Sequence, residues 1–478
     1  MKKTLNVRPV AAAALAAALV SACNLAPRYE QPALSVPDTI SAQAGTPVVA
    51  NESALGYAQT QAWIQSAALR EVIALALSHN RDLRVAVDNI ERARAQYGIT
   101  RADLLPGVSA QGQGTRSRTS AELSNNGQST IGEQYTAQLG FTSYEIDFWG
   151  RVRNLSEAGL QAFLQSEDNQ RNVQIGLVAD VSNAWLTLAA DLARLQLAQD
   201  TLASREKAYE LTRRMFEIGS TSGLVLAQNL STVETARADA AAYAAQAERS
   251  RNALQLLVGG TVRSQLLPTP QTLVAASPEN VALLPVPQDL PSSVLLQRPD
   301  VQSAEHNLRA MNANIGAARA ALFPSITLTG SVGSGSRDLD NLFASGTSTW
   351  SFMPQIKLPI FDGGRLRAGV QVAEASQRIA VSQYEKVVQT AFKEVADVLA
   401  DRAQWGQRLG AQQGVVTATQ QAFNLSDARF KAGVDNYLTV LDAQRSLYAA
   451  QQTLITLRLA EQINRAILWK ALGGREAM

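Results

Sequence analysis

Few groups in this sequence are arranged for catalysis. Its only histidines, His79 and His306, lie far apart, and neither belongs to a spacing typical of a metal site, so we expect both to be structural. The glycine-rich stretch 330–335 lies between strand-like segments, which predicts a loop beside a strand and not a phosphate cradle. No nucleophile elbow or Walker motif occurs. We therefore expect a protein that is not an enzyme and that binds no metal and no cofactor.

Cys23, the only cysteine, has the clearest chemistry. Residues 1–22 combine a basic start with a short apolar run, which is typical of a secretory signal peptide. The tetrapeptide 20–23, Val-Ser-Ala-Cys, resembles the lipobox of bacterial lipoproteins, so we expect Cys23 to be acylated. Asn24 follows, where an aspartate would resemble an inner-membrane retention signal, and this favours the outer membrane. The alternative is an incidental cysteine in a signal peptide that is cut elsewhere.

Leu438 and Asp442 lie four residues apart at the start of the last predicted helix, so they share one helix face. Asp435 or Asn436 is a suitable N-cap for that helix. By pattern alone, the ordinary interpretation is that Leu438 belongs to a packing seam and that Asp442 pairs with Arg445.

Two long helices organise the chain around these groups. Residues 151–216 contain no proline, and at 1.5 Å per residue the helix would be roughly 100 Å long. Its apolar residues recur every seven positions, which predicts a left-handed supercoil, at Val181, Leu188, Leu195, Leu202, Tyr209 and Phe216. Residues 364–431 repeat this design, except that Arg402 occupies one of the corresponding seam positions.

The remaining elements are duplicated around the two long helices. The predicted first repeat, 63–260, contains a helix, a β-hairpin over 107–148, the long helix 151–216 and a return helix over 224–258. The predicted second repeat, 292–473, contains a helix, a β-hairpin over 325–361, the long helix 364–431 and a return helix over 438–472. The other segments are an extended leader over 23–62, a proline-rich linker over 261–291 and a tail over 474–478.

The two hairpins alternate apolar and polar residues, as membrane barrel strands do. We expect polar loops over 115–134 and 333–349, and a β-bulge near Thr142 and Ser143. Four strands cannot close a barrel in lipid, because known barrels start at about eight. We therefore expect several copies to contribute strands to one barrel, with their helices closing into a cylinder. A free-standing coiled coil is the alternative.

The charge balance excludes one class of partner. Lys and Arg number 43, and Asp and Glu number 41, so no basic excess indicates nucleic-acid binding.

The duplicated order of helix, hairpin, long helix, turn and helix resembles the outer membrane factors of tripartite efflux systems, the TolC family. Within it, the chain is most similar to the OprM-like lipoprotein branch. The resemblance covers 23–474, and its most specific segments are 298–300 (Arg-Pro-Asp), 317–326 (AARAALFPSI) and 433–444 (GVDNYLTVLDAQ).

The resemblance implies a mainly α-helical, internally duplicated homotrimer with a transmembrane β-barrel. Its 12-stranded barrel would lie in outer-membrane lipid and continue as a long α-helical periplasmic tunnel, with an equatorial layer from 261–291. The implied activity is passive export of drugs and other small molecules. The implied partners are a periplasmic adaptor (membrane fusion) protein and an inner-membrane RND pump. A conduit for protein secretion and a structural periplasmic coiled-coil lipoprotein are the alternatives.

The resemblance also implies roles for two sets of residues. Leu438 and Asp442 match rings that narrow the periplasmic aperture, where the acidic ring favours cations. The residues that match adaptor-facing tips are Gly219, Ser220, Thr221, Ser222, Gly223, Gly433, Val434, Asp435 and Asn436. The chain departs from the family at Val225, where an acid is frequent, and at Phe216 and Phe430, where relatives have tyrosine. These departures leave open which links between helices hold the mouth shut.

Overall fold

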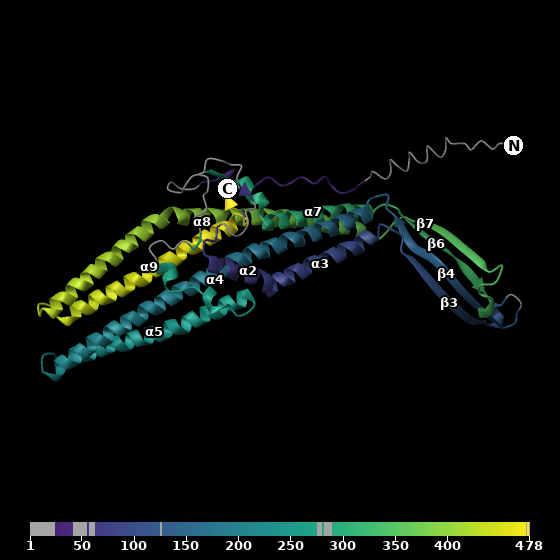
Figure 1. Ribbon diagram of the computed structural model, residues 1–478. Coiled ribbons are helices and arrows are strands. Elements are labelled where there is room, and N and C mark those ends of the chain that lie inside the picture. The colour runs from purple at the N-terminus through teal and green to yellow at the C-terminus, as the bar shows by residue number, and fades with distance from the viewer. Residues whose placement is uncertain are drawn as a thin grey trace. The chain divides into compact units, whose positions relative to one another are not determined.

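The computed structural model describes residues 24–41, 55–56, 63–124, 127–274, 280–281, 289–474 and 476–477 (Figure 1). Cys23 and the predicted signal peptide lie outside the described residues. The chain divides into two compact units, which we describe separately. The strand unit comprises Met1–Ala33, Asn89–Glu167 and Ser303–Glu385, and the hairpin unit comprises Leu34–Asp88, Asp168–Gln302 and Lys386–Met478.

One antiparallel sheet dominates the strand unit (Figure 1). Its order is β3-β4-β6-β7, with bounds Val108–Thr119, Thr130–Ile146, Ser325–Ser336 and Ser348–Lys357. The predicted bounds of the loops, 115–134 and 333–349, are wrong, because the strands continue into both segments and leave shorter loops between Thr119 and Thr130 and between Ser336 and Ser348. The hydrogen bonds of a sheet join backbone groups, so a strand can continue where its side chains are polar. In these outer strand ends, no alternation of apolar and polar residues marks the strand in the sequence.

The glycine-rich stretch 330–335 belongs to β6 and is not the predicted loop. Glycine is needed here for close approach: a Cβ on Gly333 would lie 2.1 Å from the carbonyl oxygen of Ala137, and one on Gly330 would lie 2.9 Å from the ring of Phe141. The stretch therefore lets neighbouring strands and a large ring pack closely.

The predicted bulge near Thr142 and Ser143 is confirmed. The β4–β6 register shifts between Phe141 and Tyr144, and Ser143 has a positive φ of 54°. The backbone N–H of Ser143 donates to Thr329 Oγ1 at 3.1 Å. The bulge keeps Tyr144 on the same face as Phe141 despite the slip.

Helix α7 (Pro299–Ala320) of the strand unit carries the leader along its side. Asn312 Nδ2 donates to the carbonyl oxygen of Pro27 at 2.8 Å, and the Tyr29 hydroxyl donates to Glu305 at 3.0 Å. Gly316 makes room for the leader, because a Cβ there would lie 2.7 Å from Ala26 Cβ. The leader is therefore docked by specific contacts.

The first helical segment, predicted to be continuous, is broken at Asn80 into α2 (Ala67–His79) and α3 (Arg81–Ala102). Asn80 Oδ1 accepts from the backbone N–H of Leu83, and Asn80 Nδ2 donates to the carbonyl oxygen of Leu257. An asparagine favours such caps because its side chain can replace a helical hydrogen bond.

Two long antiparallel helix pairs form most of the hairpin unit: α4 (Arg151–Glu217) with α5 (Gly223–Val258), and α8 (Arg365–Lys431) with α9 (Tyr437–Ala471). Helices α4 and α8 both have 67 residues. The α4 seam is buried at Val181 and Leu188 but only partly buried at Leu202, and Phe216 is 44% exposed. The seam thus becomes more exposed within one chain towards the helix end.

Short elements complete the chain. In the hairpin unit, β1 pairs with β5 and β2 pairs with β8, and Trp63 stacks on Trp469. The bounds are β1 Thr39–Ser41, β2 Leu55–Gly56, η2 Ala121–Leu123, η3 Ser264–Leu266, α6 Gln271–Val274, β5 Asp289–Pro291, η4 Ser292–Gln297, η5 Leu339–Asn341 and β8 Glu476–Ala477.

Candidate functional site: two helical tips and a two-faced sheet

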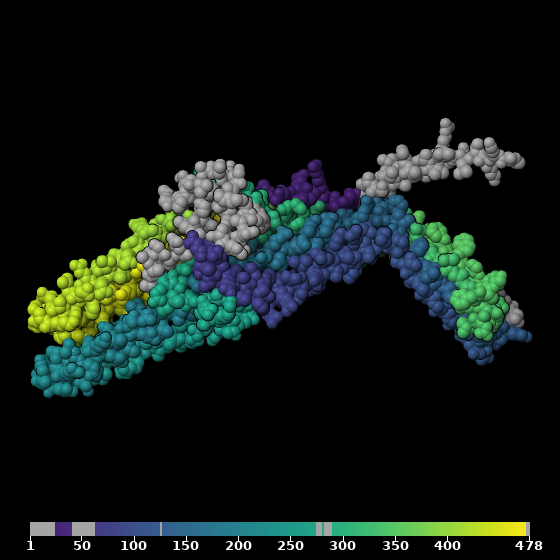
Figure 2. All heavy atoms as spheres, in the orientation of Figure 1, coloured from purple at the N-terminus to yellow at the C-terminus, as the bar shows by residue number. Residues whose placement is uncertain are grey.

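The two helix pairs of the hairpin unit end in surface tips (Figure 2). Both tips have the same backbone conformation. Each long helix stops at a glycine with positive φ, 76° at Gly219 and 74° at Gly433. Each glycine N–H donates to the carbonyl three residues earlier, and the next N–H donates to the carbonyl five residues earlier, at Phe216, Met215, Phe430 and Arg429. This is the Schellman cap, in which glycine adopts the left-handed conformation at little cost.

The return helices start with side-chain caps at corresponding positions. Ser222 Oγ accepts from the backbone N–H of Val225 at 3.4 Å, and Asn436 Oδ1 accepts from that of Thr439 at 3.2 Å. Of the two predicted caps of the last helix, Asn436 is therefore the N-cap, and Asp435 has a different partner.

That partner is Arg429, which forms a two-pronged ion pair with Asp435 at 2.6 and 2.9 Å. The hydrogen bonds from Arg429 lower the pKa of Asp435, and those to Asp435 raise the pKa of Arg429. Met215 and Thr221 stand at the corresponding positions of the first tip and cannot form this pair. Only the second of these two tips has an ion pair across its turn.

Aromatic packing also distinguishes the second tip. Phe430 and Tyr437 meet edge to face with centroids 5.2 Å apart, and burial raises the pKa of Tyr437 to about 12. Tyr437, Val440 and Leu441 form a small buried core. Residues of both helix pairs pack against it, namely Ala208, Val225, Phe423 and Phe430. Val225, which departs from the family pattern, therefore contributes an apolar contact. Gly223 replaces Tyr437 in the first tip.

Leu438 and Asp442 of α9 are not part of this core. Leu438 is 48% exposed, and the Asp442 side chain is 74% exposed. Asp442 Oδ1 lies 3.7 Å from Arg445 Nη1, so the ordinary ion pair is present but long. Leu438 is not in a buried seam of the single chain. In α5 the corresponding residues are uncharged: Leu224 is exposed and Gln228 is partly buried.

One buried residue near the tips has no clear signal in the sequence. Arg205 of α4 is 7% exposed, and its Nη1 donates to the carbonyl oxygen of Thr232 on α5 at 2.9 Å. Its guanidinium lies 6.0 Å from the ring centroid of Tyr448 on α9. Burial lowers the pKa of Arg205, although arginine stays charged. Arg205 thus contacts both helix pairs, whereas an arginine on a charge-rich helix is ordinarily predicted to be solvated.

The sheet of the strand unit has one apolar and one polar face, because cross-strand partners share a face. The apolar face comprises Val108, Ala110, Gly112, Gly114, Tyr135, Ala137, Leu139, Phe141, Tyr144, Ile146, Ile326, Leu328, Gly330, Val332, Trp350, Phe352, Pro354 and Ile356, with Ser334, Ser336 and Ser348 at its outer end. Its large side chains are exposed or only partly buried, and Trp350 is 78% exposed. Beyond Tyr135 this face carries the Arg116–Glu133 ion pair, at 2.9 Å. An exposed apolar face that ends in charges fits a lipid boundary.

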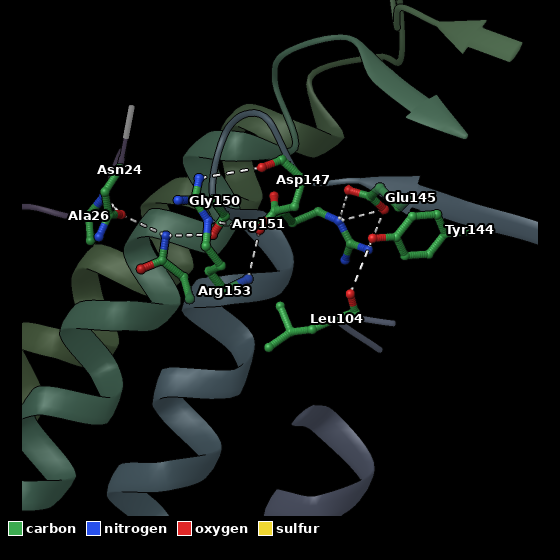
Figure 3. A network of polar contacts seen from close by, with 10 residues as sticks. Asn24, Ala26, Leu104, Tyr144, Glu145, Asp147, Gly150, Arg151 and Arg153 are labelled. Carbon is green, nitrogen blue, oxygen red and sulfur yellow. Dashed lines mark hydrogen bonds and ion pairs between the residues drawn. The ribbon is translucent and has the colours of Figure 1, made fainter. Parts of the chain in front are cut away.

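Strands β3 and β7 are the free edges of this sheet, so each presents unpaired backbone groups. Polar contacts secure the other end of the strand unit, where β4 meets α4 (Figure 3). Arg151 Nη2 donates to Glu145 at 2.6 Å, and Asp147 accepts from the backbone N–H of Arg153 at 2.8 Å. Asn154 Nδ2 donates to Asn24 Oδ1 at 2.8 Å. The residue that follows Cys23 is therefore held at the first turn of α4.

The histidines take part in local polar contacts. His306 Nδ1 lies 2.6 Å from Gln161 Oε1, and His79 Nδ1 lies 2.9 Å from the carbonyl oxygen of Leu75. These contacts fit structural roles for both side chains.

Comparisons with known proteins agree with this geometry. The family profile described as outer membrane efflux protein matches residues 72–260 and 290–474. The toluene efflux pump outer membrane protein TtgC of Pseudomonas putida is 44% identical over 464 residues, which cover 96% of this chain and 94% of that protein.

Solved structures agree as well. The crystal structure of a membrane protein from Pseudomonas aeruginosa has a TM-score of 0.87 at 40% identity and covers 94% of this chain and 100% of that chain. The open state of the Neisseria gonorrhoeae MtrE outer membrane channel has a TM-score of 0.82 at 37% identity and covers 94% of this chain and 98% of that chain.

Proposed function

The chain belongs to the outer membrane efflux protein family and is the outer-membrane channel of an efflux pump; on this premise, we propose that it works as a homotrimer. The two free edges and the two-faced sheet carry this proposal. Three copies of a four-stranded sheet supply 12 strands, enough to close a barrel with its apolar face in lipid. The polar face then lines a water-filled lumen.

The exposed seams favour the same oligomer. In one chain, apolar residues of the long helices remain uncovered towards the tips, Phe216 by 44%. Helix pairs from other copies would cover them and close a periplasmic tube, as a wall of supercoiled helices requires. The predicted repeats, 63–260 and 292–473, then each supply one hairpin and one helix pair per copy.

We propose that Cys23 is acylated and anchors the chain in outer-membrane lipid. Asn24 supports this assignment because its contact with Asn154 holds the leader at the first turn of α4, next to the end of β4. The Cys23→Ser variant should lose labelled palmitate. Palmitate retained by this variant would contradict acylation of Cys23.

The tips are proposed to contact a periplasmic adaptor, which would connect the channel to an inner-membrane RND pump. Both turns, 219–223 and 433–436, are compact, capped and at the surface of the hairpin unit. The name of TtgC describes a toluene pump component, and we infer that this chain likewise exports drugs and other small molecules. Export through it is passive, because energy would come from the pump.

Leu438 and Asp442 are proposed to form rings that narrow the periplasmic aperture. The burial of residues along α9 supports this proposal. Tyr437 and Leu441 are buried against the other helices, whereas Leu438 and Asp442 are exposed. Three copies would bring three leucines and three carboxylates around one axis.

Electron microscopy of the detergent-extracted mature protein, with its native mass, tests the assembly. We expect a threefold particle whose mass corresponds to three chains. A monomer or dimer that stays in solution without detergent would contradict the barrel and favour a coiled-coil scaffold.

A further inference from the structure

One charged position in the seam of α8 has no charged counterpart in α4. Arg402 is only 8% exposed, and Leu188 at the corresponding position of α4 is fully buried. Asn464 Nδ2 of α9 donates to the carbonyl oxygen of Val398 at 3.2 Å, so α9 packs against α8 one turn before Arg402 (Figure 1). A guanidinium, which ordinarily lies at a protein surface, is therefore enclosed where α8 meets α9.

The hydrogen bonding of Arg402 differs from that of the other buried arginines among the described residues. Arg298 pairs with Asp300 at 2.7 Å. Arg205 donates to the carbonyl oxygen of Thr232. In contrast, Arg402 Nε, Nη1 and Nη2 have no hydrogen-bond partner in the described part of the chain. A buried charge is strongly destabilising unless an acceptor compensates it, so this guanidinium requires one.

A second buried donor without a partner lies one turn along α8. Trp405 is also 8% exposed, and its Nε1 has no hydrogen-bond partner among the residues that the structure describes. Residues three apart share a helix face, so the indole and the guanidinium lie on the same side of α8. Arginine and tryptophan side chains donate hydrogen bonds and cannot accept them, so neither can satisfy the other. Both donors therefore require an acceptor from outside α8.

The charges around Arg402 favour an acceptor that is negative. Glu461 of α9 attracts the Arg402 charge, but Glu461 already accepts a hydrogen bond from Arg465. A further guanidinium, that of Arg408, lies 4.5 Å from the ring centroid of Trp405. Burial and the Arg465 charge lower the pKa of Arg402, although arginine stays charged. A water molecule would accept hydrogen bonds but would leave this positive charge uncompensated.

We propose that Arg402 and Trp405 bind a small monovalent anion, of the chloride class, between α8 and α9. The anion accepts from the guanidinium and from the indole N–H, and it offsets the net charge of Arg402, Arg465 and Glu461. Solvent does not reach the three guanidinium nitrogens or Trp405 Nε1, which favours an ion of water-like size over sulfate, phosphate or an exported solute. These residues all belong to the hairpin unit of one chain, so the inference does not depend on the proposed trimer.

The stability of the full-length mature protein in detergent, measured against chloride concentration, tests the proposal. Chloride replaces gluconate at constant ionic strength, so general screening stays the same. We expect the thermal midpoint to rise by about 2 °C or more between about 10 and about 300 mM chloride, because a ligand that binds the folded state stabilises it. A midpoint that does not depend on chloride would overturn the proposal.

Three variants connect the chloride effect to the site. Arg402→Leu gives α8 the residue that α4 has at this position, and it should abolish the rise. Arg378→Leu is the matched control, because Arg378 is exposed on the same helix, and it should keep the full rise. Trp405→Phe keeps an aromatic ring and removes one donor, so the chloride concentration at half effect should increase about fivefold. A full rise in Arg402→Leu would show that chloride acts elsewhere and would overturn the proposal.

Bromide locates the anion, because it can replace chloride and scatters X-rays anomalously. Crystals of the unsubstituted protein grown in bromide should show an anomalous peak within hydrogen-bonding distance of Arg402 and Trp405. This measurement decides the question even if Arg402→Leu does not fold. The absence of a peak at these donors would overturn the proposal. A peak there without a chloride-specific rise in the thermal midpoint would indicate an adventitious ion only and would overturn it as well.

Discussion

The two tips of the hairpin unit share a backbone and differ in side chains. Both stop a long helix at a left-handed glycine and start the return helix with a polar cap, Ser222 or Asn436. The second tip alone combines the Arg429–Asp435 ion pair, the buried Tyr437 and the acidic Asp442. Duplication has therefore kept what the turn geometry requires, while the charged and aromatic groups differ.

The largest effect should come from the aromatic core of the second tip. Tyr437→Ala should lower the free energy of unfolding by about 3 kcal/mol, because it leaves a cavity where residues of both helix pairs meet. Thermal unfolding in detergent measures the change. Tyr437→Phe is the control, since it keeps the ring contact with Phe430. Equal destabilisation by both variants would contradict a packing role for the ring.

Arg205→Ala should have the next largest effect and lower the free energy of unfolding by about 2 kcal/mol. It removes a buried hydrogen bond and leaves the carbonyl of Thr232 without this donor. Its counterpart Thr419 bonds only within its own helix, to Val415 and Val416. Thr419→Ala should therefore change thermal unfolding little. If the Thr419 variant were as destabilised as the Arg205 variant, Arg205 would have no special place between the helix pairs.

The shared backbone predicts equal effects at the two glycines. Gly219→Ala and Gly433→Ala should each lower the free energy of unfolding by about 1 to 2 kcal/mol, because both residues have positive φ. Open space surrounds both Cβ positions, so strain and not collision sets the cost. Thermal unfolding of the two variants should shift alike. A shift at only one tip would show that the caps are not equivalent in the assembled protein.

The smallest effect should come from the exposed ion pair, which solvent screens. Pairing lowers the folded-state pKa of Asp435 below 3.8, so its stabilisation is present above pH 3.8 and is lost as the pH falls through the folded-state value. Asp435→Asn should therefore lower the thermal midpoint slightly at pH 7 and converge with the unsubstituted protein in stronger acid. A difference that grew on acidification would contradict this sign.

Sequence patterns predicted the structural features that residues close together in the sequence determine. The seven-residue apolar repeat predicted the long helices. The change of phase in the apolar and polar alternation after Phe141 predicted the bulge. The outer strand ends could not be predicted, because Ser, Thr, Gly and Arg on both faces remove the alternation. Asn80 was missed as a break because the apolar spacing continues on both sides of it.

The candidate site was only partly predictable for a related reason. The tip glycines and Asn436 have local signals, since turns and caps favour those residue types. Arg205 has none, because its burial depends on Tyr448 more than 200 positions along the chain. The aperture depends on surfaces that one chain leaves exposed, so its residues follow from the family resemblance and not from periodicity.

The most direct test makes the second tip chemically like the first. Asp442→Gln gives α9 the residue that α5 has at Gln228, and Gln228→Asn is the matched control. Single-channel currents in planar bilayers across a salt gradient measure the cation preference of each variant. We predict that Asp442→Gln reduces the preference and that Gln228→Asn leaves it unchanged. An unchanged reversal potential for Asp442→Gln would contradict a charged aperture at the second tip.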